Sequence, residues 1–297
     1  MAPPAQSTHP QPALAATVKE VRETVARARK QGRTIGLVPT MGALHRGHVS
    51  LIEASKRDGH WTVVSIYVNP TQFGPSEDFA KYPRTLETDR AACRAAGADL
   101  IFVPQNNEMY LPGDQTRVIP GALAETMCGL SRPGHFDGVC TVVAKLFNIV
   151  QPDAAYFGQK DAQQALIIQR MVRDLHMPLK IVVCPLIREP DGLAMSSRNA
   201  RLDAEQRRQA LCLYKALCRG RDELKAGMSS IGRVIAAMRA TIAETSAAIG
   251  IDYLSIVDPQ TLTPIAKPKG RVMIAGAVRV GDVRLIDNIL VELSAEA

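Results

Sequence analysis

The sequence has no long hydrophobic run, no secretory leader and no paired-cysteine motif. None of its 297 residues lies in a stretch approaching the roughly 18–20 consecutive apolar residues of a membrane-spanning helix. The N-terminal MAPPAQSTHPQPALAA lacks the charged start and apolar core of a signal peptide. The six cysteines never form C-x-x-C. We therefore expect a cytoplasmic protein with reduced thiols, no membrane association, no disulfide framework and no zinc site.

Aromatic residues are scarce, which bears on the excess of positive charge. The formal net charge is +7, but lysine and arginine are spread along the chain, with no run longer than Arg207–Arg208. Aromatic residues make up 4% of the sequence and leave few platforms on which bases could stack. The composition thus disfavours a nucleic-acid partner, and anionic small-molecule substrates explain the charge as well.

Neither common glycine-rich phosphate motif is present. GALHRGHV (residues 42–49) has the glycine spacing of a P-loop but lacks its Lys and Ser/Thr. No G-x-G-x-x-G follows a predicted strand. A Walker A site and a dinucleotide fingerprint are therefore excluded, and any phosphate site must be of another kind.

What is present, from about residue 17 to 185, is an alternation of short apolar runs with helical periodicity. Such alternation is typical of a parallel sheet wrapped by helices. The predicted strands are 34–39, 62–68, 99–104, 154–157 and 180–185, and the predicted helices are 46–58, 85–96, 138–150 and 161–176. We expect a Rossmann-like, doubly wound α/β domain over residues 17–187, preceded by a disordered tail over residues 1–16.

The pattern changes after residue 188. Two helical stretches, 203–226 and 229–246, are followed by the closely spaced apolar segments IDYLSIVD, RVMIAGAVRV and VRLIDNILVE. Helices followed by neighbouring strands predict a smaller α+β domain over residues 188–297, which is a candidate lid.

Polar turns follow several predicted strands, and the first contains two histidines. Ligands of such folds bind beyond the carboxyl ends of the strands, so the turns at 39–48, 69–82 and 158–164 should converge on one crevice. H-x-G-H places His45 and His48 at a helix N-terminus, where backbone N–H groups and the helix dipole favour an anion.

Two further polar clusters support a phosphate site. FGQKDAQQ brings Lys160, Asp161, Gln163 and Gln164, and MSSRN brings two hydroxyls and Arg198. Such donors suit a triphosphate and the charge that develops on its α-phosphorus.

Other interpretations of the histidines and of the acidic residues stay open. The histidines either cap the helix only or share a metal, although no third soft ligand is evident and HRGH lacks the glutamate of H-E-x-x-H. Magnesium needs one carboxylate besides the substrate's phosphates, and Asp89 is the candidate ligand. The alternative for Asp89 is a solvated acid at a helix start.

Several longer blocks together resemble the pantoate–beta-alanine ligase family over about residues 17–292. They are VPTMGALHRGH (38–48), VNPTQFGPSEDFAKYPRT (68–85), SRPGHFDGVCTVVAKLFNIVQPDAAYFGQKDAQQ (131–164), REPDGLAMSSRN (188–199), DYLSIVD (252–258) and RLIDN (284–288). H-x-G-H alone indicates only the wider superfamily of adenylate-forming nucleotidyltransferases and class I aminoacyl-tRNA synthetases.

The resemblance implies a two-step ligation. ATP and (R)-pantoate would give a pantoyl adenylate and pyrophosphate, and the amine of beta-alanine would then displace AMP from the acyl carbon. It also implies a homodimer, and Mg2+ is the expected cofactor. Another adenylate-forming or nucleotidyl-transferring H-x-G-H enzyme, and a nucleotide-sensing module without chemistry, remain alternatives.

The resemblance also assigns residues. The catalytic residues would be His45, His48, Lys160 and Arg198. The ATP-binding residues would be Pro39, Met41, Gly42, Ala43, Leu44, His45, Arg46, Gly47, His48, Gly158, Gln159, Lys160, Asp161, Ile187, Met195, Ser196, Ser197 and Arg198. The residues for pantoate and beta-alanine would be Met41, Asn69, Gln72 and Gln164.

Arg46 stands where the family pattern has an acidic residue, and helix geometry predicts that its side chain points away from the phosphates. RPGHFDG, with Arg132 and His135, is either part of the site or an ordered loop beside it.

Overall fold

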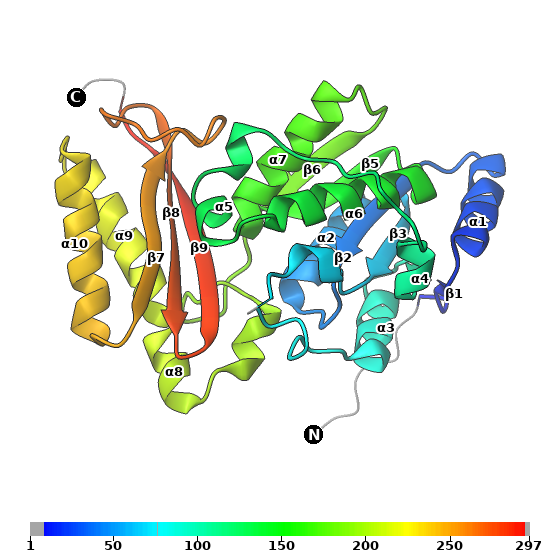
Figure 1. Ribbon diagram of the computed structural model, residues 1–297, viewed down its shortest axis with the longest axis horizontal. Coiled ribbons are helices and arrows are strands. Elements are labelled where there is room, and N and C mark those ends of the chain that lie inside the picture. Colours follow the sequence, from blue (N-terminus) through cyan, green and yellow to red (C-terminus); the bar gives the residue numbers. More distant parts are fainter. Residues whose placement is uncertain (1–8, 76, 295–297) are drawn as a thin grey trace. The chain divides into compact units, whose positions relative to one another are not determined.

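The computed structural model describes residues 9–75 and 77–294 (Figure 1). The chain divides into two compact units. Unit 1 comprises Met1–Pro120, Pro133–Gly158 and Ile167–Pro185, and unit 2 comprises Gly121–Arg132, Gln159–Leu166 and Leu186–Ala297. None of the helices in the described part has both the length and the apolar character that a membrane crossing requires.

Unit 1 contains a six-stranded parallel sheet in the order β1-β4-β3-β2-β5-β6. Its strands are β1 (Ala13–Ala15), β2 (Ile35–Thr40), β3 (Trp61–Ile66), β4 (Leu100–Phe102), β5 (Ala154–Gly158) and β6 (Lys180–Cys184). The predicted parallel α/β sheet is confirmed. Residues 13–15, which the sequence placed in a disordered tail, instead pair with β4. Residues 1–8 of that tail lie outside the described residues.

Helices cover the central strands of this sheet. They are α1 (Val18–Lys30), α2 (Arg46–Arg57), α3 (Leu86–Ala95), α4 (Asn106–Met109), α6 (His135–Val150) and α7 (Ala162–Asp174), whose first turn belongs to unit 2. Ile35, Leu37 and Val38 of β2 are all 0% exposed, so both faces of this strand are buried. A Thr17–Glu20 capping box fixes the start of α1.

The strand order reverses at β2. From β2 the chain adds β3 and then β4 on one side, and it later adds β5 and β6 on the other. The carboxyl ends of β2 and β5 therefore flank a topological switch point, where ligands bind in open α/β sheets. β2 leads into the turn before α2, and β5 ends at Gly158.

Unit 2 contains the antiparallel sheet β7-β8-β9. Its strands are β7 (Gly250–Val257), β8 (Arg271–Val280) and β9 (Val283–Glu292), and its helices are α5 (Cys128–Ser131), α8 (Ala204–Gln209), α9 (Leu211–Lys225) and α10 (Ile231–Thr245). The predicted smaller α+β part is confirmed. The single helix predicted over 203–226 is divided at Ala210 into α8 and α9.

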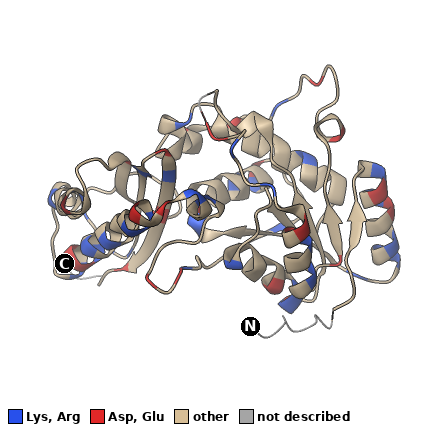
Figure 2. Cartoon of the chain, turned by 90° about the horizontal axis from the view of Figure 1, so that it is seen from below, with Lys and Arg blue, Asp and Glu red and all other residues tan. Residues whose placement is uncertain are grey.

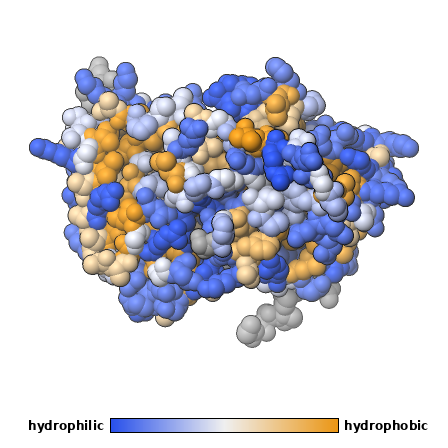
Figure 3. Space-filling view, in the orientation of Figure 1, coloured by the Kyte–Doolittle hydropathy of each residue, from blue (hydrophilic) through white to orange (hydrophobic). Residues whose placement is uncertain are grey.

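Both faces of the unit 2 sheet are covered. On one face Ile274 packs in a cluster with Leu217 and Met238 from α9 and α10. Met273 belongs to a second cluster, which includes Met127 from the segment 121–132. Apolar side chains also reach the surface around α10 and β7 in Figure 3.

Residues of both charge signs occur along the helices. Figure 2 shows Lys and Arg in blue and Asp and Glu in red on the ribbon. On α1, for example, Glu20 lies in the first turn and Arg29 and Lys30 lie in the last, which complements the helix dipole.

Candidate active site

The turn after β2 is organised by Asp89. Gly42 and Ala43 have positive φ angles of 81° and 49°. The Asp89 carboxylate accepts the backbone N–H of Ala43 at 3.0 Å and that of Leu44 at 2.7 Å, and Thr85 Oγ1 donates to it at 3.2 Å. The carboxylate is thus occupied by three donors, and the residue is 1% exposed. Asp89 is therefore not the solvated acid that was the alternative, and we expect it to support the turn rather than to bind magnesium.

His45 and His48 form a reciprocal cap at the start of α2. Nδ1 of His45 accepts from the backbone N–H of Gly47 at 3.1 Å, and Nδ1 of His48 accepts from that of His45 at 3.3 Å. The ring centroids are 4.1 Å apart. Because both Nδ1 atoms accept, each neutral ring carries its hydrogen on Nε2, which makes that nitrogen a donor. Capping and anion recognition are therefore compatible roles for different atoms of the same rings.

Arg46 belongs to the exposed side of α2. Its Nη1 lies 2.6 Å from Glu53 Oε1, and its side chain is 53% exposed. The hydrogen bond to Glu53 raises the pKa of Arg46. This pairing agrees with the side-chain direction predicted from helix geometry.

Asn69 is a buried support at the end of β3. Its amide group donates to Gln72 Oε1 at 3.2 Å and to the Gly138 carbonyl at 3.1 Å. Its Oδ1 accepts from Thr71 Oγ1 at 3.0 Å and from Tyr110 Oη at 2.9 Å. Burial raises the pKa of Tyr110, which keeps its hydroxyl protonated and able to donate. Both donors of Asn69 are used within the protein, and one of them orients Gln72; its role in binding pantoate stays a prediction.

Gln72 is oriented by these contacts. Because its Oε1 accepts from Asn69, its Nε2 is the donor end of the amide, and this atom lies 3.1 Å from Met41 Sδ. Met41, Asn69 and Gln72 are thus brought together, as the sequence predicted. His135 Nδ1 lies 2.8 Å from the Gln72 carbonyl oxygen and holds the same segment.

Gly138 allows this segment to approach α6. A Cβ atom at position 138 would lie 2.3 Å from the Thr71 carbonyl oxygen, closer than any real contact. Glycine is therefore required where α6 meets the short helix η1 (Pro70–Gln72).

In unit 2 the turn after β5 is held by β9. Lys160 and Asp161 lie in the short helix η3 (Gln159–Asp161), with Lys160 Nζ 3.4 Å from Asp161 Oδ2. Asn288 Nδ2 donates to the carbonyls of Gln159 at 2.9 Å and Lys160 at 3.1 Å, and its Oδ1 accepts from Gln159 Nε2 at 3.2 Å.

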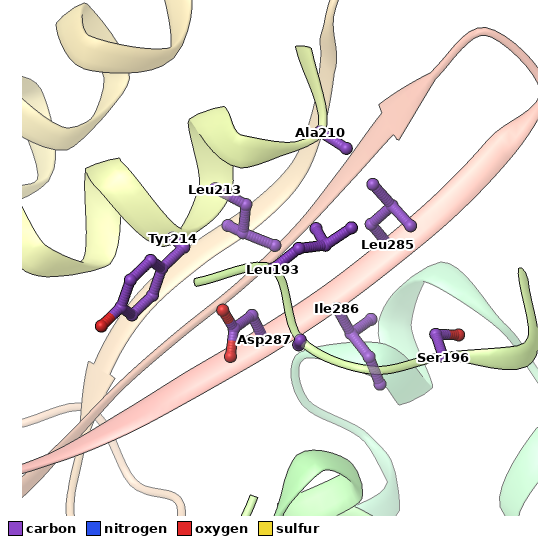
Figure 4. A pocket seen from close by; sticks show the side chains of 9 residues that line it. Leu193, Ser196, Ala210, Leu213, Tyr214, Leu285, Ile286 and Asp287 are labelled. Atoms are coloured by element: carbon purple, nitrogen blue, oxygen red, sulfur yellow. The ribbon is translucent and has the colours of Figure 1, made fainter. Parts of the chain in front are cut away.

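The segment 187–198 forms a folded-back turn in the same unit. The Met195 N–H donates to the Ile187 carbonyl at 3.1 Å, and Ser196 Oγ accepts from the Arg198 N–H at 3.2 Å. Ser197 and Arg198 begin the short helix η4 (Ser197–Arg201). Figure 4 shows that Ser196 and Asp287 line a small pocket together with Leu193 and Tyr214.

A bidentate ion pair anchors this turn to β9. Arg188 donates to Asp287 at 2.6 and 2.9 Å, and its guanidinium carbon lies 4.0 Å from the centroid of the Tyr214 ring. Burial raises the pKa of Asp287, while Arg188 and Lys160 act in the opposite direction. Asp287 is 4% exposed, so the pair is largely removed from water.

Neighbouring glutamines at the start of α7 differ in their surroundings. Gln163 is 5% exposed; it accepts from the Cys128 N–H at 3.0 Å and donates to the carbonyls of Leu123 and Thr126, both at 2.8 Å. It thus holds the segment 121–132. Gln164 is half-buried, and its role as a pantoate ligand stays a prediction.

The comparison with known proteins decides the family. The model of the family described as pantoate-beta-alanine ligase matches residues 13–290. This chain belongs to that family. It is 55% identical to the pantothenate synthetase of Moorella thermoacetica over 284 residues, which are 95% of this chain and 99% of the relative. It is 48% identical to that of Acetivibrio thermocellus, with 93% and 98% covered.

Solved structures of the pantoate–beta-alanine ligase family share the fold. The pantothenate synthetase of Thermus thermophilus superposes with a TM-score of 0.88 at 46% identity, covering 93% of this chain and 98% of the other. The ligase of Francisella tularensis, solved with beta-gamma ATP and beta-alanine, gives a TM-score of 0.78 at 35% identity, with 94% and 97% covered.

Arg188, Asp287 and Asn288 are supporting residues of this ligase fold to which the sequence alone assigned no role. They lie in the blocks REPDG and RLIDN. Their position in those blocks was the only sequence signal, because their contacts join residues 99 and 129 apart in the chain. Within the described ranges no group of three or more His, Cys, Asp and Glu side chains is arranged to hold a metal, so the alternative of a histidine-bound metal gains no support.

Proposed function

We propose that this chain catalyses the ATP-dependent ligation of (R)-pantoate and beta-alanine to pantothenate through a pantoyl adenylate. Membership in the ligase family and the Francisella relative solved with beta-gamma ATP and beta-alanine support the proposal. The main structural support in this chain is the reciprocal cap of His45 and His48, which makes both Nε2 atoms hydrogen-bond donors. These donors lie beside the topological switch point of the sheet, at a helix N-terminus that favours an anion.

The first step activates the carboxylate. A pantoate oxygen attacks the α-phosphorus, the bond to the bridging oxygen breaks, and pyrophosphate leaves with the electron pair. The negative charge that develops on the α-phosphoryl oxygens is stabilised by the Nε2–H groups of His45 and His48. We propose that Lys160 and Arg198, which belong to unit 2, supply positive charge to the phosphates of ATP.

Pantoate is bound by neutral amides. The donor end of Gln72, set by Asn69, binds a pantoate oxygen, and Gln164 binds a second one. A neutral donor holds the carboxylate without forming a strong ion pair, which would lower its nucleophilicity. In the second step the amine of beta-alanine attacks the acyl carbon, the bond to the phosphate oxygen breaks, and AMP leaves.

Magnesium fits this site only as a companion of the substrate. Asp89 is occupied by backbone N–H groups, and the described residues offer no carboxylate cluster in its place. Mg2+ usually keeps several waters and binds through the substrate's phosphates. We propose that it enters on the triphosphate and reduces the repulsion between the two anionic substrates.

We further propose a homodimer, a cytoplasmic location and a division into domains at residue 188, with a lid function for the second domain. All six cysteines are free thiols, and five are buried, which suits a reducing compartment.

Pyrophosphate exchange tests the proposed reaction. Labelled pyrophosphate should enter ATP when pantoate is present and beta-alanine is absent, because the first step is complete and reversible before the amine arrives. Exchange with another carboxylic acid but not with pantoate would favour a different adenylate-forming enzyme. ATP binding without exchange for any hydroxy acid would favour a sensing module and would overturn the proposal.

A further inference from the structure

The outer edge of β9 is occupied by side chains of the same unit. β9 is the last strand of the sheet β7-β8-β9, so within the described ranges one side of its backbone has no strand partner. At Asn288 the N–H on this side donates to Asp287 Oδ1 at 2.7 Å, and the carbonyl accepts from Arg188 Nη2 at 3.2 Å. Asp287 and Asn288 are each 4% exposed. We call these two residues the β9 anchor.

One half of the anchor fixes the segment 159–161. The Asn288 amide donates both of its hydrogens to consecutive carbonyls, those of Gln159 and Lys160, and accepts from the Gln159 side chain. Among short side chains, only an amide can donate two hydrogen bonds and also accept one. The backbone from which the Lys160 side chain projects is therefore fixed by β9.

The other half fixes the segment 187–198. Asp287 holds Arg188 through two hydrogen bonds, and Arg188 in turn donates to the Gly192 carbonyl at 2.9 Å. Arg188 also bonds the Asn288 carbonyl, so the two halves share this guanidinium. Bidentate pairs of this kind restrict direction as well as distance.

We propose that the β9 anchor positions both nucleotide-binding segments of unit 2 relative to each other, so that Asp287 and Asn288 are positioning residues for ATP. The inference rests on the proposed function for the identity of the nucleotide. Neither residue needs to touch ATP: misplacement of bound groups by about 1 Å is enough to reduce catalysis strongly.

Asn288→Asp is the principal test because it preserves size and removes both donors. A carboxylate would face the carbonyl oxygens of Gln159 and Lys160 in a buried position, so the turn should shift. In pantoate-dependent pyrophosphate exchange we expect the KM for ATP to rise about tenfold, equivalent to roughly 1.4 kcal/mol. The KM for pantoate should change by less than about twofold, because the substitution removes contacts that position the ATP-binding segments and leaves the contacts with pantoate in place.

Arg188→Lys tests the half of the β9 anchor that fixes the segment 187–198. It also replaces Asn288→Asp as the test if that variant does not fold. Lysine keeps the charge but loses the bidentate geometry, so the KM for ATP should again rise more than that for pantoate. The matched control is Ile274→Val, which removes one methylene group from the core of the same sheet and none of the hydrogen bonds that hold the two segments. Melting temperatures would be measured for all variants.

The outcomes separate the two proposals. If the Asn288 or Arg188 variant changes the KM for ATP no more than Ile274→Val does, or raises both KM values equally, the β9 anchor has only a structural role and the inference is overturned. If the unaltered chain shows no exchange, the proposed reaction fails instead. Calorimetric titration of the same variants with ATP alone then still measures whether the anchor sets nucleotide affinity.

Discussion

His48 Nδ1 accepts the backbone N–H of His45 at 3.3 Å, so the second histidine of the pair is oriented by the main chain of the first. The backbone N–H of Gly47 orients His45 in the same way. Both Nδ1 atoms thus accept from the main chain. The donor character of both Nε2 atoms is thus a property of the helix start itself.

Removing one of these rings should affect chemistry far more than folding. We expect His48→Ala to lower the rate of pantoate-dependent exchange by on the order of a hundredfold, because a donor to transition-state charge is lost. Ser50→Ala, on the same helix, removes only a bond to the Gly47 carbonyl and is the control. A His48→Ala enzyme with more than about a third of the original rate and an unchanged melting temperature would disprove the assigned role.

Asp89→Asn should destabilise the protein without altering its magnesium requirement. An amide would turn two hydrogens toward the backbone donors of Ala43 and Leu44, or leave one of them unpaired, at a cost of about 1–3 kcal/mol. Urea unfolding gives the loss, with Glu87→Gln at the exposed start of α3 as control. A rise of more than about fivefold in the magnesium concentration for half-maximal exchange would restore Asp89 as a ligand.

Gln163 and Gln164 should give opposite results. Gln164→Ala is expected to raise the KM for pantoate more than that for ATP, with little change in the melting temperature. Gln163→Ala should instead lower the melting temperature, because three backbone groups of the segment 121–132 lose their partner. Equal kinetic losses for both substrates in Gln164→Ala would show that this residue is structural.

Arg46→Glu should leave the KM for ATP nearly unchanged. A carboxylate favours a helix N-terminus by roughly 0.3–1 kcal/mol, but it would replace the Arg46–Glu53 pair with two like charges, so the two effects nearly cancel in stability. The KM for ATP would be measured at two salt concentrations. A rise of about tenfold that persists at high salt would mean that this side chain reaches the phosphates after all.

Periodicity was enough to predict most of the fold. β2, β5 and β6 are apolar runs of five or six residues, and α2 begins at the glycine-rich turn where the sequence placed it. β1 was missed because three residues, Ala13–Ala15, are too few to show an alternation. The division at Ala210 was missed because this residue keeps a right-handed helical backbone, so the apolar spacing continues across it.

Only those parts of the candidate site that depend on short sequence motifs could be predicted. His45, His48 and Gln72 stand in recognisable blocks, and the structure shows how each is oriented. The structural role of Asp89 was not predictable, because it depends on contacts across more than forty residues. An acid at a helix start looks the same in sequence whether it faces solvent or a buried turn.

The β9 anchor also has a consequence for self-association. An outer strand with a continuous row of vacant N–H and C=O groups is a template on which another copy of a chain can add a strand. At Asn288 this row is interrupted, since Asp287 takes the N–H and Arg188 takes the carbonyl. The ion pair therefore protects this stretch of the edge from intermolecular sheet growth, and substitutions that release Arg188 should make the protein more prone to aggregate on heating.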